Sequence, residues 1–506
     1  MARSPPLSAT GRRRRVACLA LACAVILLGA GRLAARAEEG GGSAALSIPL
    51  AETDDDDAVV ELPAEAPEAV LPPGIQEELN SLQRQIDELK SKAKQASTKE
   101  KAEKSGSHAP TVKFTGQVQG DQVWFGQDEI SRDAVGDLQD GAQFRRLRIG
   151  ARGTAWHQLE YSLGVDFALA NQPSYLDNYI EAHDLPWLQN VRVGHFFEPF
   201  SLERVTQNRN NTFMERSLVD TFAPARNTGV MAYGNAESER ATWQIGTFRT
   251  NSDNVGNDSF DSGQALTMRA TMLPWWDEPS DGEFYLHLGA AYSFRATSQN
   301  QVRFRNTPEI RKQQPASTFG PVGPPSPSNY INGQPGPFAP IFVDTGFIPA
   351  KNFQLFDPEF ALILGRFSLQ SEYAFAIVDQ IDGPNLFFNG YMAQASWFLT
   401  GEHRPYDRKQ GIHTRMKVLD EFYRVREGGR VRWGLGAWEI AARFSNIVLN
   451  DENIQGNNLT DFTVGLNWYL NPYTRMKINY IRAFLEDTRV GNSMTDAYGI
   501  RFDYEF

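Results

Sequence analysis

The chain has 506 residues, a formal net charge of -11, a mean hydropathy of -0.43 and two cysteines. Such low hydropathy excludes a bundle of transmembrane helices, and the acidic balance argues against nucleic acid as a partner. From residue 110 onward arginine supplies 30 of the 36 basic side chains, and guanidinium groups suit phosphate and carboxylate oxygens.

Residues 1–37 have the pattern of a cleaved export signal. Arg12–Arg15 precede a short apolar run, and the small residues that follow predict cleavage after Ala37. A membrane anchor is the alternative, but the apolar run is short for a bilayer span. Both cysteines, Cys18 and Cys23, lie in this segment, so the mature chain would have no thiol for a disulfide or a metal.

Two further N-terminal segments follow the signal. Residues 38–74 predict a flexible acidic linker, and calcium binding by Asp54–Asp57 is the weaker alternative because adjacent residues do not converge on one ion. Over 75–104 an a/d seam predicts a short coiled-coil helix rather than a lone surface helix. The seam residues are Ile75, Leu79, Leu82, Ile86 and Leu89.

From residue 112 onward apolar and polar residues alternate, as in 498–506 and 159–170. A soluble β-sandwich would also alternate, but here charged residues such as Asp166 and Arg295 recur on the polar face. Lipid outside and water inside account for both faces at once. Because the chain is exported, we expect an all-β, antiparallel transmembrane barrel in the outer membrane of a Gram-negative-type cell.

Alternation and turn signals together predict sixteen strands. An even count brings both barrel ends to the periplasmic side, where the N-terminal extension would lie. The last strand would close against the first, with Phe506 at the membrane rim, and it looks like a signal for the outer-membrane assembly machinery. The predicted strands are 112–125, 142–153, 158–170, 174–184, 190–197, 229–236, 240–249, 264–274, 283–296, 356–364, 367–378, 387–400, 433–446, 461–470, 475–485 and 495–506.

Six stretches across 112–506 resemble the family of phosphate-selective porins O and P, in family order. The resemblance implies a sixteen-stranded, homotrimeric channel with an anion-binding constriction, surrounded by outer-membrane lipid. Inorganic phosphate or other small anions are the solutes that it implies. The stretches are FRRLRIGARG (144–153), VGHFFEPFSLE (193–203), GRFSLQSEY (365–373), SWFLTGEHRPY (396–406), GAWEIAARFS (436–445) and GLNWYLNP (465–472).

Three arginines on strand 142–153 are expected to face the lumen, spaced two and four residues apart: Arg146, Arg148 and Arg152. At about 6.6 Å per two residues they would form a ladder for an oxyanion. A scaffold in which they pair with acidic residues, namely Asp166, Glu160 or Glu439, is an equally open interpretation. Further bases expected on the inner face are Arg192, Arg269, Arg295, Arg443 and Arg501.

Three connections are too long for hairpin turns. Residues 199–228 correspond by position to the family's third loop, which the resemblance places inside the barrel. Their bases are Arg204, Arg209, Arg216 and Arg226, against Glu203, Glu215 and Asp220. This near-balance leaves a general small-solute pore open. Residues 297–355 predict a surface cap, partly inserted as in relatives, and residues 401–432 a basic periplasmic vestibule.

Enzymatic motifs are absent from the sequence: it has no His-Glu-x-x-His, P-loop or Gly-x-Ser-x-Gly. His195 beside Glu198 has the residue types of an acid/base pair, but no nucleophile accompanies it. An outer-membrane lipase is the enzyme alternative. We expect a passive channel with no catalytic residue, cofactor or metal.

Overall fold

The computed structural model describes most of the chain from residue 110 onward. The predicted signal peptide, linker and coiled-coil helix lie outside the described residues. Among the residues that are described, no helix combines the length and apolar character needed to cross a bilayer. The described residues are 110–168, 173–250, 263–297, 299–310, 330–331, 334–335, 340–427 and 430–506.

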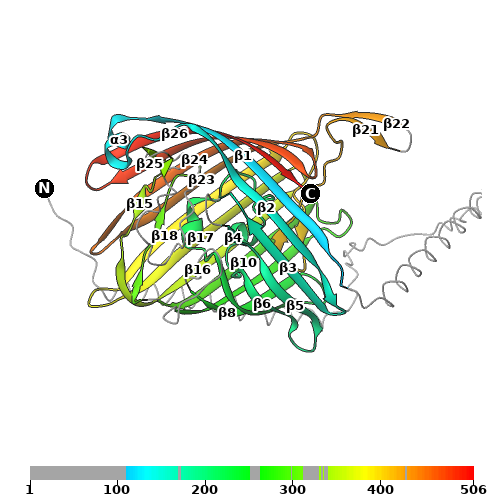
Figure 1. Ribbon diagram of the computed structural model, residues 1–506, viewed down its shortest axis with the longest axis horizontal. Helices are drawn as coiled ribbons and strands as arrows, with labels where there is room; N and C mark the ends of the chain where they lie inside the picture. The colour runs from blue at the N-terminus through cyan, green and yellow to red at the C-terminus, as the bar shows by residue number, and fades with distance from the viewer. Residues whose placement is uncertain are drawn as a thin grey trace, which may run out of the picture. The chain divides into compact units, whose positions relative to one another are not determined.

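Sixteen long antiparallel strands, counted over the described residues, form one closed barrel (Figure 1). Each long strand pairs with the next along the chain, and β26 pairs back onto β1. The strands are β1 (Lys113–Gln127), β2 (Gly141–Trp156), β3 (Leu159–Asp166), β5 (Asn178–Leu185), β6 (Gln189–Phe197), β7 (Arg226–Asn235), β8 (Ala241–Arg249), β9 (Gln264–Trp276), β10 (Phe284–Ala296), β16 (Ile348–Leu364), β17 (Phe367–Gln380), β18 (Leu386–Phe398), β23 (Ala437–Asp451), β24 (Ile454–Asn471), β25 (Thr474–Asp487) and β26 (Gly491–Glu505).

Short elements occupy the connections between the long strands. Two of them, β4 and β11, add to the barrel sheet, and the other short strands form separate pairs. These elements are α3 (Glu129–Val135), β4 (Ser174–Tyr175), α4 (Leu202–Val205), η1 (Leu218–Thr221), β11 (Gln301–Val302), β12 (Arg305–Asn306), β13 (Tyr330–Ile331), β14 (Gln334–Pro335), β15 (Val343–Asp344), β19 (Tyr406–Asp407), β20 (Ile412–His413), β21 (Tyr423–Glu427) and β22 (Arg430–Gly434).

The prediction of sixteen strands is confirmed, and each predicted strand overlaps one long strand. The largest error in a boundary is at β16, which begins at Ile348 instead of residue 356. Its first half carries buried apolar residues on the inner face, including Ala350, Phe353 and Leu355. The outer face of this half carries Lys351 and Gln354, so the faces are not those of a lipid-facing strand, and a register shift between Ala350 and Asn352 interrupts the period of two.

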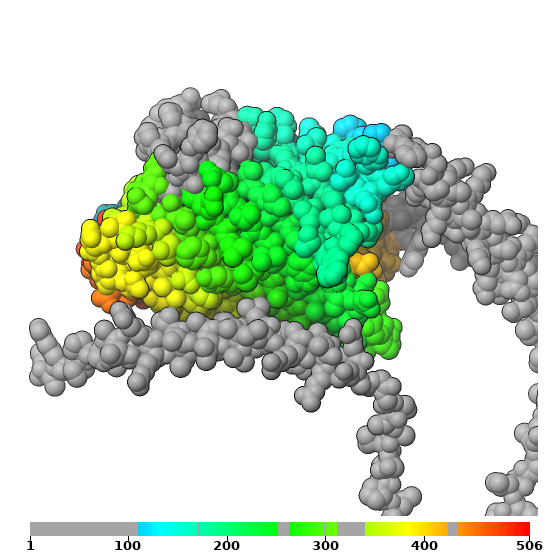
Figure 2. Space-filling model, turned by 90° about the horizontal axis from the view of Figure 1, so that it is seen from below, coloured from blue at the N-terminus to red at the C-terminus, as the bar shows by residue number. Residues whose placement is uncertain are grey.

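The outer face of the barrel is apolar. Leu147, Ile149 and Phe502 are among its exposed side chains, while their strand neighbours Arg148 and Arg501 point inward. Figure 2 shows one side of this wall as a continuous surface that runs through the cyan, green and yellow segments. Lipid outside and polar groups inside are the arrangement of an outer-membrane barrel.

The barrel closes where Phe506 meets Gly116. The Phe506 N–H donates to the Gly116 carbonyl at 3.1 Å, and the Gly116 N–H donates to the Phe506 carbonyl at 3.0 Å. The Phe506 ring covers Gly116 so closely that a Cβ atom there would lie 2.2 Å from the ring. Glycine therefore makes room for the aromatic ring across the closing strand pair.

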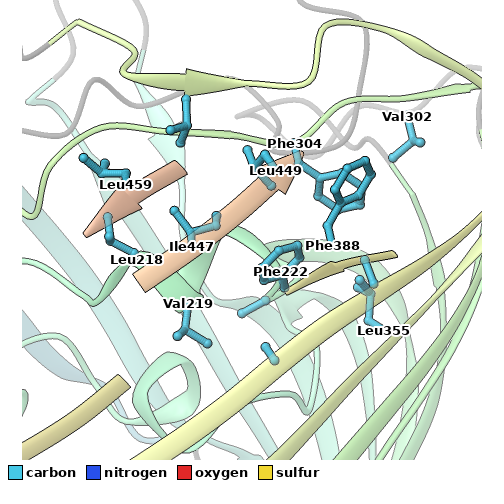
Figure 3. Packing of buried hydrophobic residues seen from close by; sticks show 14 of the residues in the cluster. Leu218, Val219, Phe222, Val302, Phe304, Leu355, Phe388, Ile447, Leu449 and Leu459 are labelled. Carbon is cyan, nitrogen blue, oxygen red and sulfur yellow. The ribbon is translucent and has the colours of Figure 1, made fainter. Parts of the chain in front are cut away.

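An apolar cluster lies inside the barrel, where two long loops fold inward (Figure 3). Phe222 and Phe304 come from these loops, with ring centroids 5.5 Å apart, and Phe304 also packs on Phe388 of the wall. Other members are Leu218, Val219, Val302, Leu355, Ile447, Leu449 and Leu459. The cluster fixes both loops against the strands, so the expected partial insertion of the 297–355 loop is observed for its described part.

The long connection between β18 and β23 divides into two parts. Its first part enters the lumen, where Arg404 donates to Glu439 at 2.5 Å. Its second part, the β21–β22 hairpin, projects beyond the end of the barrel (Figure 1), and Phe422 packs on Trp468 of β24. The prediction that all of 401–432 lines a vestibule is therefore wrong for the hairpin.

Candidate anion site in the barrel lumen

The segment between β6 and β7, residues 198–225, folds into the lumen. We name it the inward loop. Near its start lies Ser201, whose φ of 65° is in the left-handed region. The Ser201 hydroxyl donates to Glu372 of β17 at 2.5 Å, and the Glu203 N–H donates to the same carboxylate at 2.9 Å. Two bonds to one buried acid hold this strained start in place.

The middle of the inward loop crosses to the wall formed by β24–β26. Lys477 donates to the carbonyls of Asn211 and Phe213 at 2.5 and 3.2 Å, and Asn467 donates to the Thr212 carbonyl at 2.9 Å. Backbone carbonyls of the loop thus accept hydrogen bonds from the Lys477 ammonium and the Asn467 amide of the wall. These side chains hold the loop and leave little charge for a solute.

Three predicted site residues lie in buried ion pairs. Arg269 pairs with Glu359 at 2.7 Å, Arg295 with Glu198 at 2.7 Å, and Arg443 with both Glu309 at 2.5 Å and Glu203 at 3.0 Å. Their side chains are at most 1% exposed. Arg501, also predicted to face the lumen, is equally buried against Asp121 and Glu215. For these four arginines the structure matches the scaffold interpretation.

A second group of predicted site residues is paired but still accessible, with side chains 13–23% exposed. Their carboxylate partners lie on barrel strands, on the inward loop or, for Asp177, in the connection before β5. The pairs are Arg148 with Asp166, Arg192 with Glu181, Arg209 with Glu505, Arg216 with Asp220, and Arg226 with Asp177. Arg204 pairs with Asp220 at 3.0 Å and is 9% exposed.

Arg146 and Arg152 form no ion pair with any residue that the structure describes. Arg152 is exposed near the end of β2 that leads into the short turn to β3. We call the end of the barrel that carries such short turns the short-turn end. Arg146 is buried, its Nη1 donates to the Gln119 side chain at 2.6 Å, and its Nε has no hydrogen-bond partner. A buried guanidinium without a carboxylate is costly, so Arg146 is the lumenal charge best placed to gain from an anion.

Arg145 is a lumenal base that sequence reasoning missed. The β1–β2 pairing shifts register here, so Gln119 pairs with Arg146 but Gly120 pairs with Phe144. The extra residue is a β-bulge, which turns Arg145 inward beside Arg146. Its side chain donates to Glu215 of the inward loop at 2.8 and 3.0 Å. The sequence did contain a signal for this bulge. The lipid-facing residues Phe144 and Leu147 are three positions apart, whereas a regular strand would place them two apart.

These groups make one region of the lumen positive. Arg146 lies in the field of Arg145 and Arg148, and Arg148 lies in the field of Arg226. Burial acts to raise the pKa of Glu215, but Arg145 and Arg501 outweigh it and hold that pKa well below its usual range. We call this region the arginine cluster. It consists of Arg145, Arg146, Arg148, Arg204, Arg216 and Arg226, six bases against the four acids Asp166, Asp177, Glu215 and Asp220.

Glu198, the acid beside His195, is not available for catalysis. Its carboxylate accepts hydrogen bonds from Asn227 at 2.7 Å, Thr267 at 2.5 Å and Arg295 at 2.7 Å. A carboxylate with three donors, buried between β6, β7, β9 and β10, is part of the scaffold.

Solved structures align with most of the chain at low identity. The anion-selective porin of Comamonas acidovorans is 11% identical with a TM-score of 0.46, covering 78% of this chain and all of that one. The channel DcaP of Acinetobacter baumannii is 10% identical with a TM-score of 0.45, covering 79% and 98%. OmpT of Vibrio cholerae, in its trimer form, is 11% identical with a TM-score of 0.45, covering 79% and 100%.

Two proteins related by sequence have a higher identity to this chain than these solved structures do. Porin O of Pseudomonas aeruginosa is 25% identical over 397 residues, which cover 73% of this chain and 83% of the relative. An uncharacterised protein of Caulobacter vibrioides is 27% identical over 376 residues, covering 71% and 66%. The model of the protein family described as "Phosphate-selective porin O and P" matches residues 112–317 and 341–506 of this chain. The chain therefore belongs to the phosphate-selective porin O and P family, whose members are outer-membrane channels and not enzymes.

Proposed function

We propose that this outer-membrane porin conducts small anions by passive diffusion, and that it prefers oxyanions such as phosphate. The observation that carries the proposal is Arg146, a buried guanidinium with no carboxylate partner among the described residues and an unpartnered Nε. The family description supports the choice of phosphate. We place the solute path along the arginine cluster, beside the inward loop.

The preference for oxyanions depends on the balance between the hydration that an anion loses and the hydrogen bonds that it gains at the arginine cluster. It must exchange hydration for protein donors, and each charge-assisted hydrogen bond contributes roughly 1.5–3 kcal/mol. Arg148 and Arg226 are already paired with acids, so they can turn only part of their donors to the solute. Partial neutralisation keeps binding weak enough for release, which conduction requires.

The test is a selectivity measurement in planar lipid bilayers. In Arg146→Ala with Arg148→Ala we expect a lower anion-to-cation permeability ratio. We also expect phosphate to block chloride current about tenfold to hundredfold more weakly, as the loss of one such bond predicts. Lysine at both positions should keep the preference for anions but lose the fork geometry, and with it phosphate affinity.

The matched control is Arg482→Ala, because Arg482 lies on the apolar outer face of β25 and pairs with Asp496. It should leave selectivity unchanged. Reversal potentials that do not move in the alanine double variant would show that both arginines are scaffold. The proposal would then fail at this site.

A general small-solute pore is the second candidate. It is favoured by the ion pairs that neutralise most lumenal arginines, including Arg148, Arg192 and Arg226. Such a pore would show the same small block of current by phosphate, pyrophosphate and sulfate. A block that depends on the oxyanion distinguishes the first candidate from this one.

We further propose that the barrel forms a homotrimer, inserted by the outer-membrane assembly machinery, with the predicted heptad helix joining the three copies in the periplasm. Leu82→Asp with Ile86→Asp places charge on the predicted seam and should lower the temperature at which the trimer dissociates in detergent. Asn80→Asp with Ser81→Asp, at outward heptad positions, is the control. Unchanged dissociation in the seam variant would assign the helix another task.

A further inference from the structure

Three metal-ligating side chains meet at the short-turn end of the barrel. Glu160 of β3 faces Glu181 of β5 across the strand pair, and His183 follows on β5. The His183 Nε2 atom lies 3.2 Å from a Glu181 oxygen and 3.4 Å from a Glu160 oxygen. All three ligand atoms are within 4.8 Å of one another. We propose that they form a binding site for a divalent transition metal, with Zn²⁺ the best fit.

The distances fit one metal ion. Zinc bonds to nitrogen and carboxylate oxygen are about 2.0–2.1 Å long, so neighbouring ligand atoms of a tetrahedron are about 3.3 Å apart. Both distances from His183 Nε2 are close to this value. Three protein ligands leave the fourth position for water.

The charges of the site also favour a cation, because the two carboxylates outnumber Arg192, which pairs with Glu181. Glu160 and Glu181 are direct cross-strand neighbours, and like charges in that position repel. Leu163 and Ile180, on the opposite face of the same strands, are exposed toward lipid, so both carboxylates are on the lumen side. Glu160 is 57% exposed, and an ion can reach it from lumenal water.

A second layer of contacts orients the imidazole. His183 Nδ1 is 2.8 Å from the Asn190 side-chain oxygen, and the Asn190 amide nitrogen donates to the Tyr233 carbonyl at 3.2 Å. The second bond fixes which end of the amide faces the ring, so Nδ1 carries the proton. Nε2 is turned to the two acids and has no hydrogen-bond partner. Metal-bound histidines have this arrangement.

Glu181 is held in the same way. Its other oxygen accepts a hydrogen bond from Arg192 Nε, and the Arg192 guanidinium lies 4.1 Å from the Tyr179 ring centroid. The remaining oxygen, Oε1, lies 3.2 Å from His183 Nε2, and the Tyr233 side chain also hydrogen-bonds to this carboxylate. One imidazole with two carboxylates suits Zn²⁺, whereas Ca²⁺ and Mg²⁺ require six or more oxygen ligands.

The alternative is a protonated His183 in a simple ion pair with both acids, and metal binding distinguishes the two. The purified full-length porin, stripped with EDTA and dialysed against Zn²⁺ at neutral pH, should bind one ion per chain. His183→Gln should abolish this saturable binding. His157→Gln, which changes an exposed histidine in the neighbouring turn, should retain it and tests for adventitious surface binding.

Three further measurements test the site. Asn190→Ala should weaken Zn²⁺ binding about 10- to 100-fold, as expected for a group that orients a ligand. Glu160→Gln should also weaken Zn²⁺ binding. Because the Glu160 side chain is exposed, this change should leave the barrel fold intact. X-ray absorption should show nitrogen and oxygen ligands with one imidazole. No saturable binding, or equal binding by wild type and His183→Gln, would overturn the site and leave the proposed anion selectivity untouched.

Discussion

The lumenal arginines differ in the partners that they contact. Arg269 is enclosed: two of its nitrogens donate to Glu359 at 2.8 and 2.7 Å, and one also donates to the Gly411 carbonyl at 3.0 Å. It thus joins β9, β16 and the segment that enters the lumen before the hairpin. Arg146, with a single amide partner, has donors to spare.

Removal of Arg269 should therefore affect stability and not selectivity. Arg269→Ala leaves the buried Glu359 without its arginine and with only the His287 contact, which costs about 3–5 kcal/mol of unfolding free energy. We expect the folded barrel to unfold at lower urea concentration in lipid vesicles, with nearly unchanged reversal potentials. Arg269→Met with Glu359→Leu removes both charges and should recover much of the loss. A shifted reversal potential at unchanged stability would place Arg269 in the solute path instead.

Inward orientation was predictable for these residues, but their partners were not. Apolar neighbours at 147 and 149 put Arg146 and Arg148 on the inner face from sequence alone, and the structure confirms this. The groups that decide how much charge remains come from distant segments. Asn208, which accepts from Arg148 at 2.9 Å, is 60 residues away in the inward loop. Such pairings depend on the path of a loop, which has no periodic pattern.

At the scale of elements, strands were predictable because lipid and water impose a period of two on each of them. The inward loop is different. Its path follows from specific bonds to β17 and β24–β26 and from one aromatic anchor, Phe222. The family resemblance implied that the loop enters the lumen, and only its contacts define where it lies.

Phe222→Ala should loosen the inward loop. The side chain is fully buried and packs on Phe304, and its truncation costs about 3–5 kcal/mol of local packing. We expect noisier single-channel currents and faster protease cleavage within 198–225, with the barrel itself intact. Phe462→Ala, on the outer face of β24, is the control. Identical current noise in both variants would mean that the polar bonds alone hold the loop.

The whole molecule depends on closure of its first and last strands, since an open edge in a membrane leaves backbone groups without partners. At this seam Gly116 and Phe506 act as a unit, because the ring occupies the space that a side chain at Gly116 would need. Both residues lie at the short-turn end, where the exposed Tyr504 ring also packs on Phe506.

Gly116→Ala should displace the Phe506 ring and lower the fraction of barrel that migrates as folded, heat-modifiable protein. Phe506→Ala should also lower it, by removing the ring that covers the strand pair. Because both changes affect one contact, their effects should not add, and the double variant should resemble Phe506→Ala alone. Gly120→Ala is the matched control, since a Cβ atom there meets nothing within 4 Å. If Gly116→Ala were as harmless as Gly120→Ala, the ring would be free to move and closure would rest on the backbone pairing alone.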